Sequence, residues 1–267
     1  MKRDRNFHAV RVKSGFTLIE MIGVMAIMAI LAAVVVPNGL RAIDRASVSA
    51  EQKTLTNLGG EVRRYLHDYG SPPGTATWAA DISAYSEISQ LNIATNTRQM
   101  NRLYFLDPDP TPGAFHMRAI ILSSMRQGMT LPTSLTTAQF DALWRTLDGT
   151  VPSSASWNGW TAFAADYLVI ERVNFKADYH DIILSNSSGL STPPVSTIAA
   201  YEVRSSRGVL IQSGTVQPGN SFPLTLVQNV RINLYPGPTA TGNIDFTYVV
   251  NTTPKQIDFK NLHWSPQ

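Results

Sequence analysis

The sequence predicts an α+β protein in which one long N-terminal helix precedes a head rich in antiparallel β-strands. An apolar run at residues 16–36 that continues into an amphipathic helical pattern, and short alternating strands after about residue 161, predict this class. With 267 residues, 43% of them hydrophobic, the chain can bury a sizeable core. Because the chain has no Cys, disulfide frameworks and Cys-ligated metal sites are excluded.

The net charge of +3 is concentrated at the N-terminus. Residues 1–15 hold five of the 22 Lys and Arg residues but only one of the 19 acidic residues. The remainder of the chain is close to neutral, so its charge does not favour nucleic acid as a partner.

Residues 16–36 read FTLIEMIGVMAIMAILAAVVV, which is apolar or small except for Thr17 and Glu20. A helix of this length spans about 30 Å, the thickness of a bilayer core. The basic flank precedes the run, so the positive-inside rule predicts that residues 1–15 are cytoplasmic and that the chain beyond Pro37 lies across the membrane.

Three other interpretations of this run fit less well. A cleaved secretory signal has a shorter apolar stretch followed by an A-x-A site, and none follows here. A buried core helix would be apolar on one face only. A plain signal anchor fits the length but leaves Glu20 unexplained, because a carboxylate in a spanning helix costs about 2.5–3.5 kcal/mol. No Lys or Arg lies in the run, so a cationic partner must be an N-terminal amine or come from another chain.

Residues 13–20, KSGFTLIE, resemble the processing site of type IV pilins and type II secretion pseudopilins. In that family a prepilin peptidase cuts after the glycine and methylates the new N-terminal Phe. The resemblance therefore assigns processing to Gly15 and Phe16. It extends to the family's Glu at the fifth mature residue, here Glu20, and to its frequent proline at the twenty-second, here Pro37.

The resemblance also implies partners and a location. Glu20 of an incoming subunit would pair with the Phe16 amine of its neighbour, which fixes the register between helices. The expected partners are the prepilin peptidase, other copies and related subunits in a filament, the inner-membrane assembly platform and, before assembly, the bilayer. The expected location is the bacterial inner membrane, with the leader cytoplasmic and the head periplasmic, and afterwards a periplasmic or extracellular filament.

Residues 37–70 are predicted to continue the helix. Pro37 and Gly39 weaken it where the apolar run ends, which fits either a boundary kink or a segment that melts during assembly. Beyond them apolar residues recur every three or four positions, which indicates a face for the head. Gly59-Gly60 indicates close packing or a bend, and GSPPG at 70–74 predicts the end of the helix.

The rest of the chain divides into two predicted regions. Residues 75–160 form a mixed irregular insertion that contains one amphipathic helix at 137–147. Residues 161–267 form the antiparallel β-rich head, with strands near 167–173, 181–184, 198–203, 230–234 and 244–250. The turn at Ser206-Arg207-Gly208 predicts a hairpin between 198–203 and 209–211.

No catalytic motif stands out in this head. None of its histidines has a metal-ligand spacing, and no P-loop, G-x-S-x-G or G-x-G-x-x-G is present. Asp107 and Asp109 are weak calcium candidates, but each precedes a proline, so a turn is the better interpretation. Trp157 and Trp160 fit either buried anchors or exposed aromatics that bind a sugar or another subunit. We expect no catalytic residues, no metal and no cofactor.

The sequence therefore favours a structural, non-enzymatic, pilin-like subunit that assembles by helix packing after leader cleavage. One alternative is a low-abundance tip or initiating subunit whose head binds a secreted substrate, a glycan or DNA. Another is an exported enzyme on a pilin-like anchor. The type II secretion, type IV pilus and DNA-uptake machines remain open, although the absence of Cys favours the secretion type over disulfide-bonded major pilins.

Overall fold

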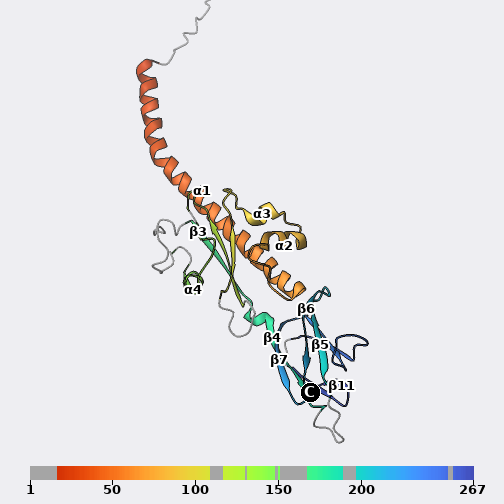
Figure 1. Ribbon diagram of the computed structural model, residues 1–267. Helices are drawn as coiled ribbons and strands as arrows, with labels where there is room; N and C mark the ends of the chain where they lie inside the picture. Colours follow the sequence, from red (N-terminus) through yellow and green to blue (C-terminus); the bar gives the residue numbers. More distant parts are fainter. Residues whose placement is uncertain are drawn as a thin grey trace, which may run out of the picture. The chain divides into compact units, whose positions relative to one another are not determined.

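The computed structural model describes residues 17–108, 117–129, 131–147, 150, 167–188, 197–251 and 255–267, without the side chains of residues 34 and 255. The chain forms two compact units, Met1–Ser47 and Val48–Gln267. A helix followed by mostly antiparallel strands confirms the predicted α+β class (Figure 1).

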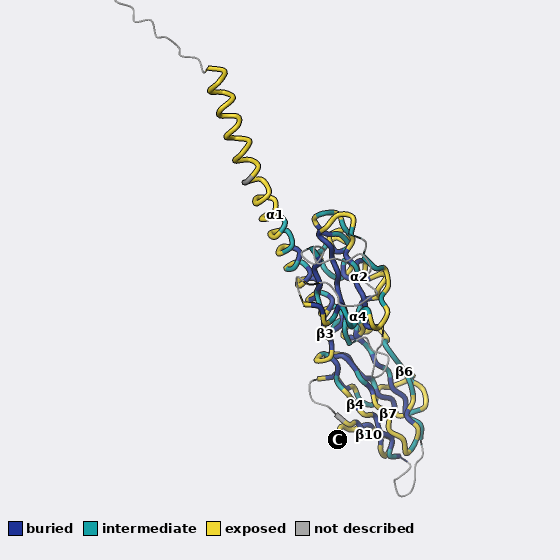
Figure 2. Tube along the Cα trace, turned by 90° about the vertical axis from the view of Figure 1, so that its left-hand side faces the viewer, coloured by how far each residue is buried: buried dark blue, intermediate teal, exposed yellow. Residues whose placement is uncertain are grey.

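The first helix, α1, runs from Leu18 to Tyr69. In the first unit its described side chains are exposed from Thr17 to Ile43 (Figure 2). Pro37 lies inside the helix, although a proline removes one backbone hydrogen bond. The end of the apolar run therefore does not end the helix.

In the second unit, α1 buries the predicted stripe. Leu55, Leu58, Val62 and Leu66 are each at most 2% exposed and belong to the main core. A Cβ added at Gly59 would approach the Glu171 and Val173 side chains to 3.2 Å, so this glycine allows close packing of the helix on a strand. The close-packing interpretation of Gly59 is confirmed.

The helix packs on a three-stranded antiparallel sheet of order β1-β2-β3, with bounds Leu103–Leu106, Arg118–Ser124 and Leu168–Asn174. A second apolar cluster, to which Phe140 and Leu143 of α4 (Thr137–Arg145) contribute, includes the alternate side chains of this sheet. Helices α2 (Trp78–Tyr85) and α3 (Gln90–Ala94) precede it. Strands β1 and β2 lie within 75–160, so the region expected to be irregular supplies two strands of a sheet.

A sandwich of two four-stranded sheets follows the short 3₁₀ helix η1 (Lys176–Asp178). One sheet has the order β11-β10-β4-β7, with bounds His263–Pro266, Lys255–Lys260, Tyr179–Asn186 and Ser221–Val227. The other has the order β6-β5-β8-β9, with bounds Leu210–Val216, Ala199–Arg204, Arg231–Tyr235 and Phe246–Val249.

The predicted hairpin is confirmed, because β5 and β6 pair antiparallel. The expectation of uniformly antiparallel strands needs one correction. Strands β10 and β4 pair in parallel, with Ile257 opposite Leu184. Their separation along the chain permits this, since parallel neighbours need a long connection.

Polar contacts join the sandwich to the end of α1. The Asp178 carboxylate of η1 lies 2.9 Å from His67 Nε2 and forms an ion pair with Arg63, whose Nε is 3.3 Å away. Arg207, in the hairpin turn, pairs with Asp68 at 3.1 Å. Gly70 ends the helix at φ +78°, and a Cβ there would overlap the Ile211 side chain. The end of α1 is thus fixed by both its backbone conformation and its neighbours.

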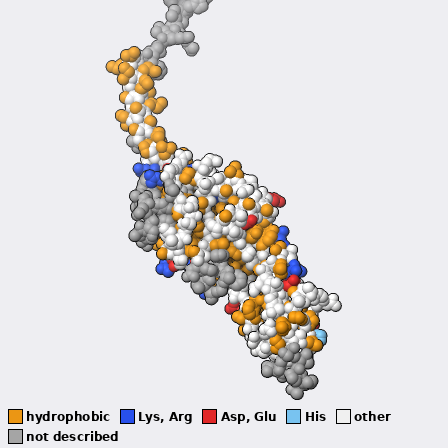
Figure 3. All heavy atoms as spheres, in the orientation of Figure 1, with side chains coloured by type: hydrophobic (Ala, Val, Ile, Leu, Met, Phe, Trp, Pro, Cys, Tyr) orange, Lys and Arg blue, Asp and Glu red, His pale blue; other side chains and the backbone are white. Residues whose placement is uncertain are grey.

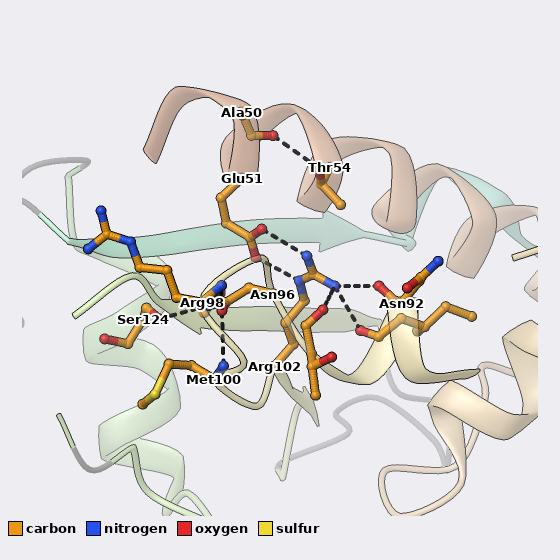
Figure 4. A network of polar contacts seen from close by, with 12 residues as sticks. Ala50, Glu51, Thr54, Asn92, Asn96, Arg98, Met100, Arg102 and Ser124 are labelled. Atoms are coloured by element: carbon orange, nitrogen blue, oxygen red, sulfur yellow. Dashed lines mark hydrogen bonds and ion pairs between the residues drawn. The ribbon is translucent and has the colours of Figure 1, made fainter. Parts of the chain in front are cut away.

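A buried ion pair ties α1 to the segment between α3 and β1 (Figure 4). Arg102 donates to the Glu51 carboxylate from Nε at 2.6 Å and from a terminal nitrogen at 2.8 Å. Its other terminal nitrogen donates to the carbonyls of Asn92, Ile93 and Thr95 at 2.5, 3.2 and 2.6 Å. The two charged side chains are 3% and 1% exposed, so this clamp is part of the core.

Candidate functional site

The candidate site is the N-terminal end of α1, where Glu20 has a local partner. Glu20 Oε2 accepts hydrogen bonds of 2.8 Å from both the backbone N–H and the hydroxyl of Thr17. The Glu20 N–H donates back to Thr17 Oγ1 at 3.3 Å. This reciprocal pattern is a capping box, in which a threonine and a glutamate three residues later satisfy free backbone donors of the first turn.

The capping box lowers the electrostatic cost of the Glu20 carboxylate. The sequence indicated that only a cation from outside the run could offset the cost of its carboxylate. Two donors from Thr17 offset part of that cost within one chain, and the N-terminal end of the helix dipole favours a negative charge there. Glu20 is therefore stabilised without an intermolecular contact, although hydrogen bonds from neutral groups leave its charge uncompensated.

The capping pattern was readable in the sequence. Thr17-Leu18-Ile19-Glu20 has the T-x-x-E form and precedes an apolar run. Thr17 is polar within an apolar run, and its spacing from Glu20 is the signal that identifies it as a capping partner. Gly15 and Phe16, the residues assigned to processing, lie outside the described residues, so their roles stay predictions.

The exposed apolar surface of the N-terminal part of α1 is a second feature of the site (Figure 3). Leu18, Ile19 and Met25 are 80%, 78% and 68% exposed, and no part of the most apolar window of α1 is buried. Among the described residues, α1 is the one helix long and apolar enough to cross a membrane. An exposed apolar surface of this size is typical of a segment that contacts a membrane or another protein.

Of the two weak calcium candidates, the structure describes Asp107. Asp107 is buried and forms an ion pair with Arg118, whose Nε is 2.6 Å from Asp107 Oδ2. A terminal nitrogen of Arg118 is also 3.0 Å from Asp141 Oδ1. Burial lowers the pKa of Arg118, but the bonds and charges of the two carboxylates outweigh it and raise that pKa above its ordinary value. Asp109 lies outside the described residues. Within the described ranges, no group of three His, Asp or Glu side chains could hold a metal ion.

Two His–Asp pairs in the second unit join structural elements. His67 meets Asp178 at 2.9 Å, and His263 Nδ1 meets Asp245 Oδ1 at the same distance. Asp245 also accepts the Trp264 backbone N–H at 2.6 Å, which ties β11 to the residues before β9. Over the part of the chain that the structure describes, neither imidazole hydrogen-bonds a hydroxyl that could serve as a nucleophile. Trp157 and Trp160 lie outside that part.

Solved structures offer only distant likenesses. The chain is 10% identical to the "Trapped Toxin" structure, covering 38% of this chain and 25% of that chain at a TM-score of 0.21. It is 12% identical to the T6SS protein TssM C-terminal domain from EAEC. That match covers 33% of this chain and 95% of that domain, at a TM-score of 0.22. The match to the human-specific toxin intermedilysin has 13% identity. It covers 38% of this chain and 25% of the toxin, at a TM-score of 0.19. At these scores the likenesses do not extend to the overall fold.

No curated protein matches the chain in sequence. The family model described as "Prokaryotic N-terminal methylation motif" matches residues 10–36. This range includes Gly15, Phe16 and the capping box, together with the apolar run up to Val36. The chain therefore carries the signature of the prepilin-type proteins, the type IV pilins and pseudopilins.

Proposed function

We propose that this protein is a structural subunit of a pilin-like filament, of the type II secretion or type IV pilus kind. It is made as a prepilin, cleaved between Gly15 and Phe16, and held in the inner membrane by residues 16–36 until assembly. The observation that carries this proposal is the methylation motif at 10–36, which leads directly into a helix with an unburied apolar surface.

In this proposal Glu20 exchanges partners during assembly. Before assembly its carboxylate accepts the two Thr17 donors, which lowers the cost of holding it in lipid. In the filament it pairs with the Phe16 amine of a neighbouring subunit. A full positive charge in a low-dielectric environment stabilises the carboxylate more than neutral donors do, so the exchange favours the assembled state.

The first test replaces Glu20 and follows insertion, cleavage and assembly separately in the native bacterium. Glu20→Leu should insert and lose its leader, but it should enter filaments poorly because the intermolecular pair is absent. Glu20→Gln keeps the Thr17 contacts without the charge and should show the same defect. Normal incorporation of both variants into filaments would refute the assigned role.

A second test addresses processing. Replacing Gly15 with Leu should leave the leader attached, which mass spectrometry detects as a chain about fifteen residues heavier than the wild type. Thr17→Val serves as a matched control, because it removes only the hydroxyl of the capping box and should still be cleaved. An untrimmed wild-type chain in the native bacterium would contradict the proposal.

The second candidate is a low-abundance tip or initiating subunit. The eight-stranded sandwich beyond the sheet that packs on α1 favours it, because filament packing through α1 does not require this module. Under this candidate the sandwich binds a secreted substrate, a glycan or DNA. Low copy number, together with direct binding of one of these ligands by the purified protein, would support it, whereas a copy number equal to that of the main subunit would argue against it.

A further inference from the structure

The two turns of α1 that follow the apolar run have two unlike faces. Arg41 and Arg45 are four residues apart, about 40° around the helix, and both are exposed. Ile43, about 160° around the helix from each arginine, is 62% exposed, and Leu40, about 100° from Arg41, is 58% exposed.

The distance from the apolar run places both arginines near the edge of the membrane. Arg41 lies five residues beyond Val36 and Arg45 nine, about 8 Å and 14 Å along the helix. The headgroup layer on each side of the hydrocarbon core is about 5–8 Å thick. Helical side chains lean toward the N-terminus and cover the preceding turn, so both guanidinium groups lie closer to the apolar run than their Cα atoms do. That direction is toward the bilayer.

We propose that Arg41 and Arg45 bind the phosphates of anionic phospholipids in the leaflet where α1 leaves the membrane. This inference rests on the proposed function, because it requires residues 16–36 to span the bilayer. Guanidinium groups bind phosphate oxygens bidentately, and Leu40 and Ile43 extend the apolar contact on the other face. The contacts fix the depth of the subunit before assembly and must be released when it leaves the membrane.

Asp44 sets the strength of this lipid preference. It lies between the two arginines in sequence and about 60° from Arg41 around the helix, so the charged face has a net charge of +1. One net charge beside an anionic surface gives about a fivefold preference, since the interaction is worth about 1 kcal/mol. The same reasoning predicts a larger preference when Asp44 is neutralised.

The test measures which lipids surround the full-length chain in reconstituted vesicles. Because the chain has no Cys, Ala46→Cys places a single fluorescent donor beside the arginines. Energy transfer is then compared between phosphatidylcholine vesicles that contain acyl-labelled phosphatidylglycerol and those that contain acyl-labelled phosphatidylcholine. We expect about fivefold enrichment of phosphatidylglycerol, more in the Asp44→Asn chain, and none in the Arg41→Gln/Arg45→Gln chain.

Matched controls separate a local site from overall charge and from a failed anchor. All these chains keep the same leader, so differences between them report on residues 41–45. Arg231→Gln removes an exposed head arginine and should leave the enrichment unchanged. Equal enrichment with and without Arg41 and Arg45, or an equal loss with Arg231→Gln, would overturn the lipid site alone. Release of the wild-type chain from vesicles by alkaline carbonate would overturn the proposed function and this inference with it.

Discussion

The clamp between Glu51 and Arg102 gives the sharpest prediction about stability. Arg102→Met leaves the Glu51 carboxylate buried without its cation, which costs about 3–5 kcal/mol. The same change removes the donor to three carbonyls, at about 1 kcal/mol each. The expected loss, about 6 kcal/mol or more, is comparable with the whole stability of a typical domain, about 5–15 kcal/mol.

A double-mutant cycle checks this reasoning. Urea unfolding of the full chain in detergent, followed by Trp fluorescence, is compared for Glu51→Leu, Arg102→Met and the double variant. Each single change leaves one buried charge unpaired, so the double variant should be more stable than the sum predicts by at least about 3 kcal/mol. Arg145→Gln, which breaks a 4.0 Å surface pair, is the control and should cost under about 0.5 kcal/mol. If the losses of unfolding free energy in the two single variants simply add in the double variant, Glu51 and Arg102 do not stabilise the fold as a pair.

Three further predictions concern the second unit. Gly70→Ala should lower the unfolding free energy by at least about 1–2 kcal/mol, because φ is +78° and the added methyl meets a neighbouring side chain; an unchanged urea midpoint would contradict this. Burial raises the pKa of Tyr104, and burial, with a smaller contribution from a nearby Asp, raises that of Tyr179. Since both raised values belong to the folded state, the contribution of these two tyrosines to stability should be constant below about pH 10 and fall above it by up to about 1.4 kcal/mol per pH unit for each tyrosine. Tyr104→Phe should reduce that slope in unfolding curves from about pH 8 to 11. Thr136→Ala removes the capping box of α4 and should cost about 1 kcal/mol, measured against Thr136→Ser, which keeps the hydroxyl.

Much of the local structure could be predicted from short-range patterns. Helical spacing identified the buried face of α1, and alternation identified β8 and β9 to within a few residues. The hairpin between β5 and β6 followed from its turn, where Gly208 has a φ of +84°. The capping box at Thr17 and Glu20 was equally local and could have been found by the same means.

Strands β1 and β2 were missed for a different reason. Leu103–Leu106 is four residues long, and Arg118–Ser124 carries apolar and serine side chains without regular alternation, because both of its faces are buried. Helix α1 covers one face of this sheet and α4 helps to cover the other, so no polar face marks the period of two. Only tertiary packing identifies these segments as strands.

Consecutive residues encode the prepilin-type signature, the length of the apolar run and the buried stripe of α1, so each of these could be predicted before the fold was known. The pairing of Arg102 with Glu51 across 51 positions and the parallel pairing of β10 with β4 follow only from the folded arrangement. The physical reason is that these contacts join residues far apart in the chain. Their energy depends on burial and geometry that exist only once the sheets and helices have packed.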